Sequence, residues 1–146
     1  MKIEGVTHWS IPVNDLAESE HFYADILGLE HRGRLGDSGM ACVRAGDHNI
    51  LLCQRSKAAA IPDKPDSPAH HSFHMSSVEW EKGVRTLADN KVPIKELVYR
   101  EQGFFLGREL YFQDPSGNQL ELRDPNWKPG MPKPSVEEIL AGVTAA

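Results

Sequence analysis

The chain lacks the features that mark disulfide-rich or membrane proteins. Its 146 residues include only two cysteines, Cys42 and Cys53, which show no paired zinc spacing and are too few for a disulfide framework. No apolar run approaches the roughly 20 residues that a membrane-spanning helix needs. The opening residues, Met1 to Glu4, do not resemble a signal peptide. We therefore expect a cytoplasmic protein that does not associate with membranes.

An excess of positive charge is also missing. The 16 Lys and Arg residues are outnumbered by 21 Asp and Glu residues, which gives a net charge of −5. This balance does not favour nucleic acid or an anionic membrane as a partner. Apolar residues make up 40% of the chain, which is enough for a core. The length suits one domain, or two small modules that share a core.

One pattern occurs twice along the chain. In each copy a histidine precedes one large apolar residue by three positions and another by five, as in His8–Val13 and His70–Met75. The alternation in each copy is typical of a strand with one packed face, and a helical stretch follows both. The spacing between the copies is too long for a solenoid repeat. It therefore indicates duplication of one module.

Periodicity and turn residues predict the same order of elements in both modules: one strand, one helix and three strands. We expect the first module at residues 1–56, a linker rich in proline at 57–68, and the second module at 69–124. A tail with a short helix follows at 125–146. In the second module, Asp114-Pro115-Ser116-Gly117 predicts a tight turn before the last strand. The fold class predicted is α+β.

Three side chains in these modules could bind one metal ion. His8 and His70 hold the same register in the two copies, on the face opposite the apolar stripe. Glu121 lies in the expected last strand between two leucines that point the other way. Burying an unpaired carboxylate costs several kcal/mol, so Glu121 requires a cation. We predict a metal site formed by His8, His70 and Glu121.

The first module offers no second carboxylate. If Gly46–Leu52 matches Ser116–Leu122, then Leu51 takes the place of Glu121, and the metal has three protein ligands and open positions. Two imidazoles and one carboxylate are typical of ferrous enzymes that activate oxygen, whereas structural zinc normally has four ligands. We therefore expect Fe(II) as the cofactor, with Mn(II) as the alternative.

The repeated module, the two histidines and the run from Tyr111 to Glu121 resemble the vicinal oxygen chelate superfamily. That superfamily includes glyoxalase I, type I extradiol dioxygenases, fosfomycin-resistance transferases and bleomycin-binding proteins. The resemblance extends from about Gly5 to Asp124. It implies two βαβββ modules that form a cupped, eight-stranded mixed sheet with flanking helices. It does not fix the reaction, because one fold hosts several chemistries.

The resemblance leaves several functions open. Glyoxalase-type lyases and isomerases are expected to carry a second glutamate where this chain has Leu51. Fosfomycin-type thiol transferases keep two histidines and one glutamate, but they share a serine-rich loop where this chain has Gly103–Arg108. Bleomycin-binding relatives lack the ligands, and a sequestering module of that kind is the non-catalytic alternative.

Extradiol dioxygenases match the run from Leu110 to Glu121 best. By this resemblance Tyr111 is the phenol that hydrogen-bonds the substrate on the metal. His74 would replace an acid–base histidine that the dioxygenases carry before Leu110. The favoured reaction is ring cleavage of a catechol-type compound, with an aromatic or other oxygen-chelating small molecule and dioxygen as partners. We also expect a homodimer, because small two-module relatives usually pair.

Overall fold

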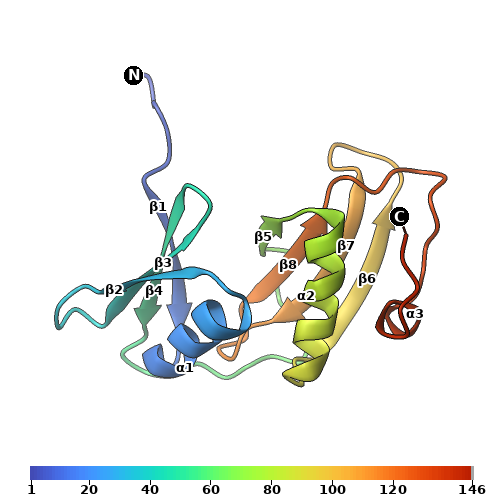
Figure 1. The fold of residues 1–146 in the computed structure, drawn as a ribbon. Coiled ribbons are helices and arrows are strands. Elements are labelled where there is room, and N and C mark those ends of the chain that lie inside the picture. Colours follow the sequence, from blue (N-terminus) through green and yellow to red (C-terminus); the bar gives the residue numbers. More distant parts are fainter. Residues whose placement is uncertain (146) are drawn as a thin grey trace. The chain divides into compact units, whose positions relative to one another are not determined.

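The computed structural model describes residues 1–145, which fall into two compact units (Figure 1). The first unit comprises residues 1–64 and 114–118, and the second comprises residues 65–113 and the chain from residue 119. Each unit contains one four-stranded sheet. Within the described part of the chain, the helices are too short and too polar to cross a membrane.

The sheet of the first unit has the strand order β1-β4-β3-β2. β1 is parallel to β4, and the other two pairings are antiparallel. The strands are β1 His8–Val13, β2 Glu30–Arg34, β3 Met40–Ala45 and β4 His48–Gln54. Cys42 and Cys53 are free thiols on β3 and β4. The predicted order of one strand, one helix and three strands is confirmed for this module.

The helical segment of the first unit changes geometry midway. It begins as α1, Leu16–Glu20, and continues as the π-helix η1, His21–Ile26. The sequence pattern predicts a helical stretch here, and its second half has the π form: the backbone N–H of Leu27 donates to the carbonyl of Phe22, five residues earlier, at 3.0 Å. Two consecutive residues of η1, Phe22 and Tyr23, are both buried.

The core of the first unit forms on one face of its sheet. Asp15 caps α1 by accepting a hydrogen bond from the backbone of Glu18 at 2.8 Å. The helical segment can then pack its apolar side against the strands. The buried apolar residues are Ile11, Val13, Leu16, Phe22, Tyr23, Ala41, Val43, Ile50 and Leu52.

The second unit repeats the arrangement, with the strand order β5-β8-β7-β6. β5 is parallel to β8, and β7 is antiparallel to both β8 and β6. The elements are β5 His71–His74, α2 Ser77–Asp89, β6 Ile94–Arg100, β7 Gly107–Gln113 and β8 Gln119–Asp124. Two mixed four-stranded sheets with few helices confirm the α+β class and the duplicated βαβββ module.

Helix α2 lies against one face of the second sheet (Figure 1). Ser76 caps its start, and Trp80, Val84 and Leu87 form its buried stripe. The indole N–H of Trp80 donates to the carbonyl of Leu122 at 2.9 Å, which fixes the helix on β8. Side chains at alternate positions of β7 and β8 therefore point either toward α2 or toward the opposite face.

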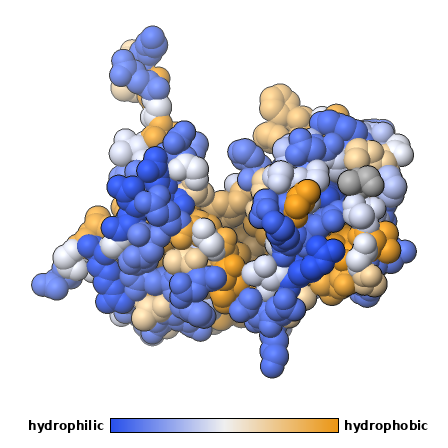
Figure 2. All heavy atoms as spheres, viewed as in Figure 1, coloured by the Kyte–Doolittle hydropathy of each residue, from blue (hydrophilic) through white to orange (hydrophobic). Residues whose placement is uncertain are grey.

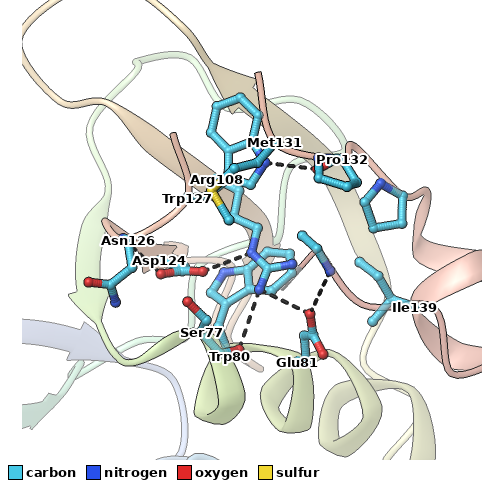
Figure 3. A network of polar contacts seen from close by, with 12 residues as sticks. Ser77, Trp80, Glu81, Arg108, Asp124, Asn126, Trp127, Met131, Pro132 and Ile139 are labelled. Carbon is cyan, nitrogen blue, oxygen red and sulfur yellow. Dashed lines mark hydrogen bonds and ion pairs between the residues drawn. The ribbon is translucent and has the colours of Figure 1, made fainter. Parts of the chain in front are cut away.

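The α2 side of this sheet contains a buried ionic network around Arg108 (Figure 3). Its guanidinium pairs with Asp124 at 2.9 Å and with Glu81 at 3.1 Å, and it lies 4.2 Å from the centre of the Trp80 ring. The C-terminal segment covers this region with the buried Trp127 and with the short helix α3, Val136–Leu140. Trp127 is thus a packing residue of the tail.

The predicted turn between β7 and β8 is confirmed, and it belongs to the first unit. The carboxylate of Asp114 accepts hydrogen bonds from the backbone of Ser116 at 2.9 Å and of Asn118 at 2.8 Å. It also accepts one from the hydroxyl of Tyr23 at 2.8 Å. Gly117 takes a positive φ of 84°, which suits glycine at this position.

Polar residues cover much of the visible surface, with scattered apolar residues between them (Figure 2). The large exposed apolar side chains include Trp9 on β1 and the pair Phe104 and Phe105 on the loop between β6 and β7. The rings of this pair lie 5.0 Å apart in an edge-to-face arrangement. The exposure of the pair shows that it is not part of the core.

Candidate metal centre

The strand registers place the predicted ligands at equivalent positions of the two modules. β1 aligns Ser10 with Leu51 of β4, and β5 aligns Ser72 with Glu121 of β8. Each serine follows a predicted ligand histidine by two positions. Leu51 therefore occupies the site in the first module that Glu121 occupies in the second, as the sequence predicted.

His70 and Glu121 form a close pair in the second unit. The Nε2 atom of His70 lies 2.9 Å from Oε2 of Glu121. The Nδ1 atom of the same ring lies 2.8 Å from the carbonyl oxygen of Pro68, and the hydroxyl of Ser72 donates to Oε1 of Glu121 at 2.9 Å. The carboxylate is 5% exposed and the imidazole 37% exposed. Both side chains are thus held in place by a second partner.

This geometry suits a shared cation. Nδ1 of His70 faces the Pro68 carbonyl, and Nε2 faces the carboxylate of Glu121, where either a proton on Nε2 or a metal ion between the two atoms balances the negative charge. Two ligands about 2.1 Å from one ion and at a right angle to each other are about 3 Å apart. Orientation of a ligating imidazole by a backbone carbonyl is usual at metal sites. The donors therefore fit a divalent metal.

The third predicted ligand, His8, lies in β1 of the first unit and is exposed. Residues 1–145 contain no preformed group of three His, Cys, Asp or Glu side chains that could hold a metal ion. The second unit alone therefore brings together two of the three predicted ligands, and metal binding by the set with His8 stays a prediction.

Tyr111 lies next to the ligand pair. It is the cross-strand partner of Glu121, and its ring is 5.7 Å from the ring of His70, edge to face. Its hydroxyl donates to Oε2 of Glu109 at 3.0 Å. Burial, the charge of Glu121 and the bond to Glu109 raise the pKa of Tyr111, so its hydroxyl stays protonated. Tyr111 therefore lies on the sheet face that bears Glu121, here called the ligand face, and its catalytic role stays a prediction.

Glu109 is a buried carboxylate on the same face that the sequence analysis missed. Its side chain is only 3% exposed, and Nη2 of Arg100 lies 2.8 Å from its Oε2. Nε of Arg123 lies 3.5 Å from its Oε1. Burial alone would raise the pKa of Glu109, but the hydrogen bonds from Arg100 and Tyr111 outweigh it and lower the pKa below its usual value. Glu109 therefore stays ionised.

The other predicted catalytic residue, His74, ends β5 and is exposed. The register places it beside Arg123 of β8, in the row that continues to Glu109 of β7. It therefore lies on the ligand face, one row away from Glu121. Its acid–base role stays a prediction.

The alternation of side chains along the strands could have identified the residues that the sequence pattern did not single out. Ser72 lies two positions after His70, Arg123 two after Glu121, and Glu109 two before Tyr111. Residues two apart in a strand share a face, so each belongs on the face of the neighbouring predicted ligand or catalytic residue. What the spacing could not give is which of them bond to one another.

Two curated relatives show similarity over most of the chain. Glutathione transferase FosA of Serratia marcescens is 26% identical over 120 residues, which cover 82% of this chain and 80% of the relative. Metallothiol transferase FosB of Staphylococcus epidermidis (strain ATCC 12228 / FDA PCI 1200) is 27% identical over 122 residues, which cover 84% of this chain and 82% of the relative.

Solved structures agree with the fold. A glyoxalase/dioxygenase from Nostoc punctiforme matches with a TM-score of 0.70 and 24% identity, over 83% of this chain and 90% of that one. A mutant of the fosfomycin resistance protein FosX from Listeria monocytogenes matches with a TM-score of 0.69 and 21% identity, over 84% and 93%. The profile of the Glyoxalase/Bleomycin resistance protein/Dioxygenase superfamily matches residues 5–122, and the chain belongs to this superfamily.

Proposed function

We propose that this protein is a divalent-metal-dependent enzyme that adds a thiol to a small electrophilic substrate, with His8, His70 and Glu121 as metal ligands. The observation that carries the proposal is the pair of His70 and Glu121, whose facing atoms are 2.9 Å apart. Their second partners, the carbonyl of Pro68 and the hydroxyl of Ser72, preorganise the pair for a cation.

The choice of reaction rests on the named relatives. They are a glutathione transferase and a metallothiol transferase, and the structure of the FosX mutant holds Mn(II) and 1S,2S-dihydroxypropylphosphonic acid. These names favour the thiol-transferase alternative over extradiol ring cleavage, which the run from Leu110 to Glu121 had favoured. We accordingly propose Mn(II) rather than Fe(II) as the working metal and do not propose dioxygen as a substrate.

The proposed reaction is the opening of a strained ring such as an epoxide. The sulfur of the thiol forms a bond to one ring carbon, the bond from that carbon to oxygen breaks, and the released oxygen takes up the proton that the thiol gave up. A bound divalent ion supplies Lewis-acid stabilisation of that oxygen. The chain itself contributes the fixed Tyr111 hydroxyl beside the reacting group. His74 is the proposed acceptor of the thiol proton.

We further propose that the protein acts in the cytoplasm as a homodimer. His8 would come either from the same chain as His70 and Glu121 or from the second copy. Mixing His8→Ala and Glu121→Gln proteins separates the two arrangements. If the site uses two copies, the mixture regains Mn(II) sites that neither variant has alone, and if it uses one copy, no sites return.

The central test is metal binding by the full chain. We expect one tight Mn(II) site per chain by calorimetry. Glu121→Gln, His70→Ala and His8→Ala should each weaken it by at least about tenfold, since loss of even an outer-sphere partner typically costs 10–100-fold. His48→Ala is the matched control, because His48 is an exposed histidine outside the proposed ligand set. Unchanged Mn(II) affinity in Glu121→Gln would contradict the proposal.

The reaction class has its own test. Mn(II)-loaded protein should add glutathione to fosfomycin or another small epoxide, detected as the thioether product. The matched arm loads the protein anaerobically with Fe(II) and measures oxygen uptake with a panel of catechols. Thioether formation without oxygen uptake supports the transferase. The opposite result would restore ring cleavage.

A further inference from the structure

Tyr111 borders both predicted metal ligands of the second unit. On β7 it pairs with Glu121 of β8, so the two side chains leave the sheet on the same face, with Cβ atoms typically about 5 Å apart. Its ring lies 5.7 Å from the ring of His70, edge to face. The phenol therefore lies beside any group that a metal ion at His70 and Glu121 would hold.

The hydroxyl of Tyr111 has its only hydrogen committed to one partner. A phenol can donate one hydrogen bond, and its oxygen can also accept. In Tyr111 the hydrogen is donated to Oε2 of Glu109 at 3.0 Å. The two residues lie two positions apart on β7, so their side chains share one face. Toward any other neighbour, the Tyr111 oxygen can therefore only accept.

Two arginines fix the direction of this hydrogen bond by keeping Glu109 ionised. Nε of Arg100 donates to Oε1 at 3.0 Å and to Oε2 at 2.9 Å, and its Nη2 lies 2.8 Å from Oε2. Nε of Arg123 lies 3.5 Å from Oε1. Positive neighbours favour the charged form of a carboxyl group, and an ionised carboxylate can only accept. The donor between Glu109 and Tyr111 is therefore the phenol.

The two buried carboxylates of the ligand face take their hydroxyl donors from different residues. Ser72 donates to Oε1 of Glu121 at 2.9 Å, whereas Tyr111 donates to Glu109. Oε2 of Glu121 faces Nε2 of His70. Glu109 thus holds the Tyr111 hydrogen on the side away from the carboxylate that is the proposed metal ligand.

We infer that Glu109 is a positioning residue: it holds the Tyr111 hydroxyl as a hydrogen-bond acceptor toward His70 and Glu121, so the reactant group beside Tyr111 is a donor, such as a hydroxyl or a thiol S–H. Glu109 acts through Tyr111 and needs no contact with the reactant. The inference rests on the proposed function for the presence of a reactant, whereas the direction of the hydrogen bond rests on the contacts of this face alone. Tyr111 is then not the group that gives a proton to the released oxygen.

The first measurement is the direction of the Tyr111 hydrogen bond in the metal-free full chain. The intensity ratio of the tyrosine Raman doublet is low for a phenol that mainly donates and high for one that mainly accepts. The chain has three tyrosines, so the difference between wild-type protein and Tyr111→Phe isolates Tyr111. We expect the ratio of a strong donor, which rises in Glu109→Gln because a neutral amide is a weaker acceptor than a carboxylate. The ratio of an accepting phenol in wild-type protein would overturn the inference.

The second measurement is a double-mutant cycle on kcat/KM for thiol addition, at saturating Mn(II). Tyr111→Phe and Glu109→Gln should each lower kcat/KM by about threefold to tenfold, the size of one hydrogen bond. In the Tyr111→Phe background, Glu109→Gln should change kcat/KM by less than about twofold, because the group through which Glu109 acts is gone. An effect of the Glu109 charge on the metal or on the substrate would persist in that background. Equal effects with and without the phenol would therefore overturn the inference.

Glu109→Asp separates position from charge. It keeps the negative charge but draws the carboxylate back by one methylene group, so we expect a loss of kcat/KM close to that of Glu109→Gln. A wild-type value would show that the charge alone matters. Glu96→Gln is the matched control, because Glu96 is an exposed carboxylate opposite Tyr111 on β6. Water screens its charge, and its replacement should change kcat/KM by less than about twofold.

The outcomes separate this inference from the proposed function. If Mn(II) does not bind or no thioether forms, the proposed function fails, and the Raman measurement on metal-free protein still decides whether Glu109 holds Tyr111 as an acceptor. If the enzyme is active but the Tyr111 doublet is the same in wild-type protein and in Glu109→Gln, the inference is wrong and the proposed function stands.

Discussion

Replacing Arg108 with methionine should destabilise the protein by about 3–5 kcal/mol, because breaking a buried ion pair leaves an uncompensated charge. Arg108 is 1% exposed and its partner Asp124 is 0% exposed. Asp124 would keep one hydrogen bond, from the backbone of Asn126 at 2.9 Å. The contact of the guanidinium with the Trp80 ring would also be lost, which is worth about 0.5–2 kcal/mol within that total.

The same reasoning predicts that a second change recovers much of the loss. In Arg108→Met/Asp124→Asn the buried charge is gone, and replacing a complete buried ion pair by neutral groups is often neutral or better. Glu81 is 12% exposed and can be hydrated, so it needs no further change. We therefore expect the double variant to be more stable than Arg108→Met alone, by about 1–3 kcal/mol.

Urea denaturation followed by tryptophan fluorescence measures these changes, because Trp80 and Trp127 are buried in the unit that contains Arg108. The matched control is Arg32→Met, which breaks the exposed pair of Arg32 and Glu30 at 3.2 Å and should cost about 0–1 kcal/mol. A loss below about 1 kcal/mol for Arg108→Met, or strictly additive effects in the double variant, would refute the argument.

Three further changes have expected outcomes in the same assay. Tyr23→Phe should cost about 1–2 kcal/mol, because Asp114 keeps its other donors. Burial, and after it the charge of Asp114, raises the pKa of Tyr23 in the folded protein. The stability that Tyr23 contributes is therefore complete below about pH 10, where the unfolded chain also keeps the phenol protonated, and it falls as the pH rises further. Tyr23→Phe should weaken this pH dependence. Gly107→Ala should cost at least about 2 kcal/mol of stability, because φ is +149° and the new Cβ would lie 2.6 Å from the backbone oxygen of Asp124. The control Gly5→Ala, whose Cβ would meet nothing within 4 Å, should leave the stability unchanged. Ser135→Ala should cost about 1 kcal/mol by removing the capping box of α3, and an unchanged midpoint would show that α3 does not unfold with the rest.

The elements of this fold were readable from local patterns. The alternation at His8–Val13 and the turn at Asp114–Gly117 each depend on residues a few positions apart. The duplication added the equivalence of Leu51 and Glu121, because two copies of one module share one register. The register of the structure confirms this equivalence.

The second half of the first helix was not readable in this way. Its α and π forms differ only in which carbonyl accepts each N–H, and a stripe of apolar residues fits both. Packing of the consecutive residues Phe22 and Tyr23, with the Tyr23 hydroxyl on Asp114, accompanies the π form. These contacts join positions far apart in the chain.

Local patterns were enough to predict the duplicated α+β module, the face that bears the polar groups, and His70 with Glu121 as candidate ligands. Only the tertiary structure decided which groups hold that pair in place and which residues surround it. The carbonyl of Pro68, the hydroxyl of Ser72 and the cluster of Glu109 with Arg100 and Arg123 act through contacts set by strand pairing and loop path. Periodicity assigns a side chain to a face, but its bonding partner depends on which strand lies beside it, and that is fixed when the sheet forms.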